Sequence, residues 1–125
     1  MDFIFDNIRI PLAYTIWAKR ELLKRFKDPQ GIQAAFAVTD EIELTENMSA
    51  IGSIFAQAYS LRKKSRCALT GESDDSNPIS EEALFSLLDR ESTLLLIEAI
   101  SNTVTEANKT TVEVKSTEKK DEAKP

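Results

Sequence analysis

The feature that most constrains the fold is an amphipathic stretch in the middle of the chain, LTENMSAIGSIFAQAYSLRKKS, residues 44–65. Its apolar side chains recur at the spacing of one helix face, which comprises Leu44, Met48, Ile51, Phe55 and Ala58. A helix with one apolar face must bury it, so Ile51 and Phe55 are expected to anchor the core. Gly52 costs up to about 1 kcal/mol against Ala, unless it lets another helix pack closely.

The ends of this helix carry their own signals. Thr45 is the expected N-cap, because a threonine side chain can accept a hydrogen bond from the first turn. Arg62, Lys63 and Lys64 are expected in the last turn, where cations complement the carbonyl end of a helix. The residues before it, TDEIELTE, are ambiguous between strand and helix, and RCALTGESDDSNP after it has the composition of a loop.

The N-terminal residues, FIFDNIRIPL, alternate between apolar and polar positions, as β-strands do. Asp6 and Asn7 tolerate a positive φ angle, so they can close a two-residue β-hairpin. Pro11 ends the second strand or confines it to a sheet edge. Two strands alone are marginally stable, so the hairpin must pack on helices.

Further helices are expected on both sides of the central one. Residues 12–28 have apolar side chains at helical spacing, and IQAAFAV after them has the pattern of a short helix. Ser80 and Asp89 are the expected N-caps of two helices in the C-terminal half. Leu94, Leu95 and Ile97 widen the apolar stripe of the last helix. Such a helix is usually buried between others or is partly covered by a partner chain.

These patterns predict a mainly α fold, with about four helices and a short N-terminal β-hairpin in one domain over residues 1–110. Residues 111–125 are expected to form a flexible, charged tail, because no aliphatic side chain larger than that of Ala123 follows Val114. The alternating TTVEV at its start could pair as a strand with a partner. The conformation of residues 28–43 and the oligomeric state, including a homo-oligomer, stay open.

The composition narrows the classes of function. The net charge is −5 and the chain contains no histidine, so general nucleic-acid binding and histidine-based catalysis are both disfavoured. Cys67 is the single cysteine, which suits a reducing compartment. The longest aliphatic run, residues 94–97, is far shorter than the roughly 20 residues of a membrane span. We therefore expect a cytoplasmic, non-enzymatic protein without catalytic residues, a cofactor or a metal.

Candidate partner-binding residues come from two features besides the last helix. Arg62, Lys63 and Lys64 form a basic cluster, most typical of a solvated helix face, with an acidic protein partner as the second interpretation. Trp17 lies on the first helix, where an aromatic residue belongs to the core edge more often than to an interface.

The order of elements resembles the tail assembly chaperones of long-tailed bacteriophages and related prophages. The similarity rests on Ser80-Glu81-Glu82, Leu84, Leu87-Leu88-Asp89, the helix with Glu98-Ala99-Ile100 and the charged end. The similarity to this family is loose over residues 3–17 and closer over residues 79–125. Residues 28–43 show no similarity to it.

The resemblance implies a helical protein that binds the tape measure protein in the host cytoplasm and assists assembly of the tail tube. It further implies contact with the major tail tube protein through the tail or through a longer, frameshifted form. Lys119 and Lys120 lie where such a frameshift could occur. A different class stays open, a small regulatory adaptor that binds protein or DNA through its basic helix ends.

Overall fold

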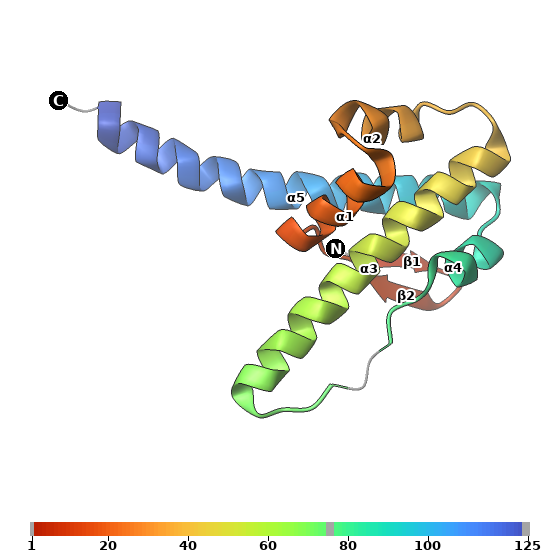
Figure 1. Ribbon diagram of the computed structural model, residues 1–125, viewed down its shortest axis with the longest axis horizontal. Helices are drawn as coiled ribbons and strands as arrows, with labels where there is room; N and C mark the ends of the chain where they lie inside the picture. Colours follow the sequence, from red (N-terminus) through yellow and green to blue (C-terminus); the bar gives the residue numbers. More distant parts are fainter. Residues whose placement is uncertain (1, 75–76, 124–125) are drawn as a thin grey trace.

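The computed structural model describes residues 2–74 and 77–123, with side chains in the last helix as far as Asn108. Its elements are β1 (Asp2–Phe5), β2 (Ile8–Pro11), α1 (Ile16–Phe26), α2 (Pro29–Phe36), α3 (Glu41–Thr70), α4 (Glu81–Leu87) and α5 (Arg90–Ala123) (Figure 1). This order confirms the mainly α fold with an N-terminal hairpin, with five helices in the described part rather than about four. The boundary predicted at residue 110 falls inside α5. The flexible tail predicted for residues 111–125 lies beyond the described side chains and stays a prediction.

The N-terminal hairpin forms as its turn residues predict. β1 and β2 are antiparallel, and Phe5 pairs with Ile8 on either side of the turn. Asp6 and Asn7 both have positive φ angles, 46° and 64°, which a two-residue turn matching the strand twist requires. Phe3 is buried on the inner face of the sheet. β1 packs against α5 and β2 against α3, so the hairpin ties the two long helices together.

Helix α3 is longer than the sequence indicated at both ends. Asp40 is its N-cap and accepts a hydrogen bond of 2.9 Å from the Glu43 backbone, so the prediction of Thr45 as the cap was wrong. The ambiguous TDEIELTE segment forms the cap and first turns of this helix. Thr45 lies inside the helix, buried, with its hydroxyl oxygen 3.2 Å from that of Thr93 on α5.

The predicted last turn of α3 was also placed too early. The helix continues through Arg66 to Thr70, because the segment RCALT contains several good helix formers. Arg62, Lys63 and Lys64 therefore lie before the last turn, and their charges do not neutralise the terminal carbonyl groups.

The core surrounds the middle of α3, where Ile51 and Phe55 are almost completely buried, as predicted. The other large side chains with almost no exposure are Phe3, Met48, Leu84, Leu96 and Ile100. They come from β1, α3, α4 and α5, so segments distant in the sequence converge on one helix. Helices α1, α2, α4 and α5 all pack against α3.

Helix α1 begins at Ile16 rather than at Leu12. Thr15 caps it, since its side-chain oxygen accepts a 3.2 Å hydrogen bond from the Ala18 backbone. Leu12 precedes the helix and is buried, and the backbone of Ala13 donates to the carbonyl of Phe55 at 3.1 Å. Ile16 was expected in the apolar stripe but is 82% exposed, because the later start leaves it on the outer side of the helix.

A tight turn connects α1 to α2. Lys27 has φ 75° and ψ −49°, and the Asp28 backbone donates to the Phe26 carbonyl at 2.9 Å, which makes a γ-turn. Asp28 then caps α2 by accepting a 2.7 Å hydrogen bond from the Gly31 backbone. A Cβ atom at Gly31 would lie 2.0 Å from the Phe26 carbonyl oxygen, so only glycine fits this junction.

Both predicted caps in the C-terminal half are confirmed. Ser80 accepts a 3.1 Å hydrogen bond from the Ala83 backbone at the start of α4. Asp89 accepts one of 2.8 Å from the Ser92 backbone, and the Ser92 hydroxyl oxygen accepts one of 2.8 Å from the Asp89 backbone. This reciprocal pair fixes the direction in which α5 leaves the short loop after α4.

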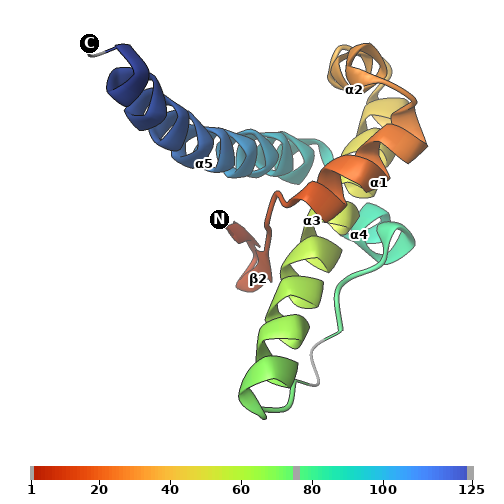
Figure 2. The ribbon, with the colours of Figure 1, turned by 60° about the vertical axis from the view of Figure 1, so that its left-hand side comes forward.

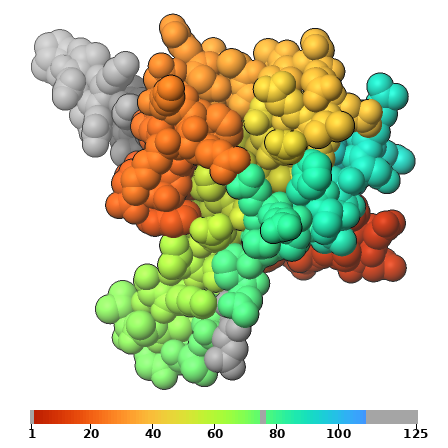
Figure 3. Space-filling model, turned by 45° about the vertical axis from the view of Figure 1, so that its right-hand side comes forward, coloured from red at the N-terminus to blue at the C-terminus, as the bar shows by residue number. Residues whose placement is uncertain are grey.

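Two views show the shape that results. In Figure 1 and Figure 2 the second half of α3 extends past the other elements, and α5 leaves the body in a different direction. The space-filling view shows the end of α3 as a separate lobe (Figure 3). We call residues 61–70 the α3 arm; they are mostly exposed, including Leu61 and Leu69.

Candidate partner-binding site

An apolar groove of about 380 Å³ lies between the α1–α2 pair and α5. Its apolar lining residues are Tyr14, Leu22, Ile32, Phe36, Ile100 and Val104. Its polar lining residues are Ser101 and Thr105. α2 packs against α1 and α3, whereas α5 packs against α3 and β1. The groove therefore lies between two sets of helices that both pack against α3.

Local sequence places the apolar side chains on the two walls. Ile32 and Phe36 are four residues apart on α2, and Ile100 and Val104 are four residues apart on α5, so each pair lies on one helix face. The ring of Tyr14 lies at the base, with its centroid 5.5 Å from that of Phe55. Burial raises the pKa of the Tyr14 phenol above its ordinary value, so the group is neutral across the physiological range.

Two of the predicted binding residues lie on α5 before the part of the helix that lines this groove. Leu94 is 59% exposed, and Ile97 is half-buried against the core. Both share one helix face with Ser101 and Val104, which line the groove. The apolar surface available to a partner is therefore longer than the groove itself.

The third predicted α5 residue, Leu95, lies on a different side of the helix. It is 42% exposed and lines a separate shallow cavity of about 200 Å³ with Phe5 and Leu87. Asp89 and Glu91 border this cavity, so its surroundings are acidic. Leu94 and Leu95 are thus neighbours in sequence that face different surfaces.

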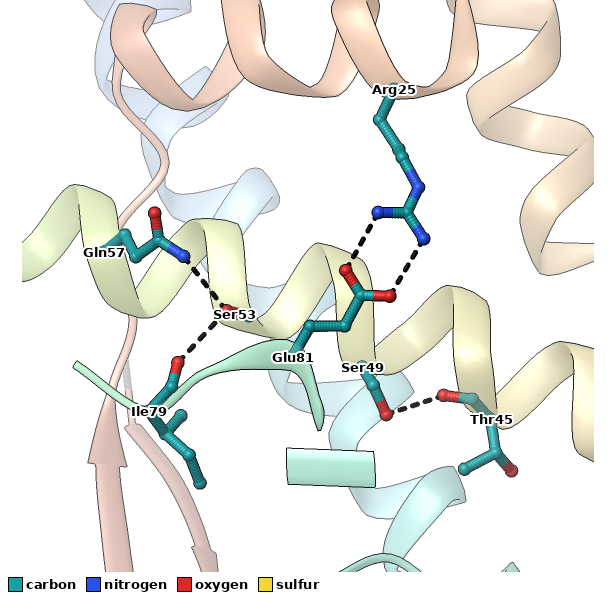
Figure 4. A network of polar contacts seen from close by, with 7 residues as sticks. All are labelled: Arg25, Thr45, Ser49, Ser53, Gln57, Ile79 and Glu81. Carbon is teal, nitrogen blue, oxygen red and sulfur yellow. Dashed lines mark hydrogen bonds and ion pairs between the residues drawn. The ribbon is translucent and has the colours of Figure 1, made fainter. Parts of the chain in front are cut away.

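Trp17 lies in another cleft, of about 410 Å³, between α1, α3 and the start of α4. One ion pair spans this cleft: Arg25 donates two hydrogen bonds of 2.8 Å to the carboxylate of Glu81 (Figure 4). The hydrogen bonds with Glu81 raise the pKa of the Arg25 guanidinium. Trp17 is half-buried here, at the edge of the core and away from the apolar groove.

The remaining polar groups of this cleft are paired with each other. Gln57 donates to the Ser53 hydroxyl at 3.1 Å, and that hydroxyl donates to the carbonyl of Ile79 at 3.0 Å (Figure 4). Ser49 similarly donates to the carbonyl of Thr45 at 2.7 Å. The contact from Ser53 to Ile79 holds the segment before α4 on α3, whereas the other two lie within α3, so the cleft near Trp17 is a structural junction.

The basic residues form a further surface, on the α3 arm. Arg62 and Lys63 are exposed and Lys64 is half-buried, and within the described residues none of the three forms an ion pair. The structure thus places the predicted binding residues on four surfaces: the α5 face of Leu94 and Ile97, the cavity beside Leu95, the Trp17 cleft and the basic α3 arm.

Sequence reasoning missed the α2 side of the groove. The spacing of Ile32 and Phe36 in IQAAFAV was the available signal, but it does not show which helix lies opposite. Tyr14, which precedes α1 in the chain, also lines the groove.

The described residues contain neither a metal-ligand cluster nor a membrane-spanning helix. Within residues 2–74 and 77–123, no group of three or more Cys, Asp or Glu side chains is arranged to hold a metal ion. No helix of the described part is both long and apolar enough to cross a membrane. Comparison with known proteins finds no matching family model, curated protein or solved structure.

Proposed function

We propose that this protein is a non-enzymatic chaperone of phage tail assembly, which binds the tape measure protein through the apolar groove between α2 and α5. The groove is the observation that carries the proposal, because its lining is mainly apolar and the exposed Leu94 lies on the same face of α5. An amphipathic helix binds such a groove with side chains at i, i+3, i+4 and i+7. The tape measure protein is long and helix-rich, so it offers segments of this kind.

The resemblance described above supplies the identity of the partner, and the surface supports the mode of binding. A helical client with exposed apolar residues aggregates unless that surface is covered. Binding in the groove would cover one face of such a helix. The charged C-terminal residues would then recruit the major tail tube protein, and assembly would take place in the cytoplasm of the bacterial host.

Co-expression with the tape measure protein tests the proposal, and α5 offers a matched pair of variants. Leu94→Lys places a charge on the face of α5 that includes Ser101 and Val104, whereas Leu95→Lys places the same charge on another side of the helix. Both side chains are substantially exposed, so both variants should fold. We expect Leu94→Lys to weaken co-purification of the client about tenfold or more, as for a central interface residue, and Leu95→Lys to retain it.

The proposal is wrong if the full-length protein neither keeps the tape measure protein soluble nor co-purifies with it at low salt. Equal loss of binding in Leu94→Lys and Leu95→Lys would place the contact elsewhere on α5. Circular dichroism of each variant serves as the control for folding.

A regulatory adaptor is the second candidate, and the α3 arm favours it. Arg62 and Lys63 are exposed on a helix that extends beyond the body, where they could reach an acidic protein or DNA. A DNA complex would weaken steeply with salt, because each phosphate contact releases counterions. A gel shift that disappears in Arg62→Glu and is unchanged in Leu94→Lys would favour the adaptor over the chaperone.

A further inference from the structure

A second pocket lies at the base of the α3 arm and is separate from the apolar groove. It has a volume of about 230 Å³, between β2, α3 and residues 77–79. That volume corresponds to about eight water molecules, which is smaller than a site for a drug-sized ligand. Its α3 wall comprises Ala56, Tyr59, Ser60 and Lys63, whose spacing places them on one helix face.

The floor of this pocket is apolar. Ile10 of β2 and Ala56 of α3 are buried there, and Pro78 and Ile79 cover the opposite side. A compact hydrocarbon group would remove this surface from water and would be stabilised by the hydrophobic effect. A ligand for the pocket must therefore carry a short apolar part.

Ser60 supplies an unusual polar group in this apolar pocket. The residue is only 5% exposed, and its hydroxyl oxygen has no hydrogen-bond partner in the described part of the chain. Buried hydroxyl groups are nearly always paired, since an unpaired one loses its hydrogen bonds to water without replacement. An oxygen atom of a bound ligand would provide the missing acceptor.

The charge at the mouth of the pocket selects an anion. Lys63 lies three residues after Ser60 and forms no ion pair within the described residues. Arg9 faces it from β2, but its guanidinium is already bound by the carboxylate of Asp2. One cation thus remains uncompensated, which suits a single carboxylate better than a doubly charged phosphate.

We infer that this pocket binds a carboxylate attached to a short, branched apolar group, with Lys63 pairing the carboxylate and Ser60 donating to one of its oxygens. The chemistry is shared by a free branched-chain acid and by a peptide that ends in leucine or a similar residue. The site is independent of the apolar groove, so it does not rest on the proposed chaperone function.

The test is an NMR titration of the full-length, ¹⁵N-labelled chain with 4-methylpentanoate and with its uncharged amide. For so small a ligand we expect a dissociation constant of about 1–10 mM, with saturable shifts at Ser60, Lys63 and Ile79. The amide should bind about tenfold more weakly, because it lacks the charge that Lys63 pairs. N-acetylglycyl-leucine and its C-terminal amide form the second arm, and the tighter of the two acids identifies the source.

Three variants separate the site from a general effect of charge. Lys63→Gln should weaken binding about tenfold, whereas Lys64→Gln, which removes an adjacent charge outside the pocket, should leave it unchanged. Ser60→Ala should weaken binding while raising the melting temperature, since it removes an unpaired buried hydroxyl.

Two results would overturn the inference. One is the absence of saturable shifts for both acids at concentrations up to about 50 mM, well above the expected dissociation constant. The other is equal affinity for the acid and its amide, or for the parent protein and Lys63→Gln. Retained amide spectra in each variant show that the chain is still folded.

Discussion

Leu84 of α4 packs directly over Gly52 of α3, and a Cβ atom at position 52 would lie 2.9 Å from its Cδ2 atom. Leu96 of α5 closes the same position, with its Cδ1 atom 3.2 Å away. The single glycine in the middle of the central helix α3 is thus the point where three helices approach one another. The sequence pattern allowed for this role, and the structure confirms it.

Gly52→Ala should therefore destabilise the protein, although alanine favours helix formation by about 1 kcal/mol. Overpacking against Leu84 and Leu96 should outweigh that gain and leave a net loss of about 1–2 kcal/mol. Urea denaturation measures the change. The converse substitution Ala68→Gly, on the exposed part of α3, should show the ordinary cost of glycine. A Gly52→Ala variant more stable than the parent would contradict this packing.

Phe55→Ala should cost about 3–5 kcal/mol, because the ring is fully buried and its removal leaves a cavity beneath Tyr14. That loss is a large part of the stability of a small domain. Phe85→Ala is the matched control, since Phe85 is 37% exposed, and we expect a loss of no more than about 1.5 kcal/mol there. Similar denaturation midpoints for the two variants would argue against Phe55 as an anchor.

The γ-turn at Lys27 predicts a stabilising substitution. A side chain at φ 75° is strained, so Lys27→Gly should raise the free energy of unfolding by about 0.5–1 kcal/mol, after the entropy cost of glycine. Lys19→Gly in the body of α1 should instead lower it by about 1 kcal/mol. Thermal unfolding of the two variants distinguishes a local backbone effect from the loss of a lysine.

Asp89 predicts a pH dependence. Hydrogen bonds from the Ser92 backbone and hydroxyl hold the pKa of the Asp89 carboxyl below its ordinary value. The stabilisation by this cap is therefore complete above the unfolded pKa of about 4 and is lost as the pH falls through the lower folded value. Asp89→Asn keeps a capping oxygen but does not titrate. Its melting temperature should fall less than that of the parent between about pH 6 and about pH 3.

The outcome for Asp89→Asn is informative in either direction. Parallel melting curves of parent and variant across this range would show that Asp89 does not contribute to acid unfolding. Asp89→Ala, which removes the capping oxygen altogether, should melt at a lower temperature than Asp89→Asn at each pH.

Features that depend on neighbouring residues were predictable from the sequence. Ser80 and Asp89 form hydrogen bonds within their own first helical turns, and Asp6-Asn7 determines the hairpin through its own φ angles. Ile51 and Phe55 followed from periodicity alone, because the most regular apolar stripe belonged to the most buried helix.

Features that depend on distant contacts were not predictable in the same way. Thr45 has the chemistry of an N-cap, but its hydroxyl contacts Thr93, which lies 48 residues away. Leu94 and Leu95 have nearly identical patterns in sequence, and only the positions of β1, α2 and α4 around α5 separate the groove from the acidic cavity. The pocket beside Ser60 likewise requires three segments that are far apart along the chain.

The α3 arm also allows an intramolecular distance to be measured with residues that the chain already contains. The sequence contains one tryptophan and one cysteine; Trp17 lies in the body and Cys67 on the arm, half-buried. Trp17 fluorescence can therefore donate energy to a single acceptor dye coupled to that thiol. The efficiency of this transfer reports the distance between the arm and the body in solution, with no engineered residue. A ligand that shifts the arm would change the emission.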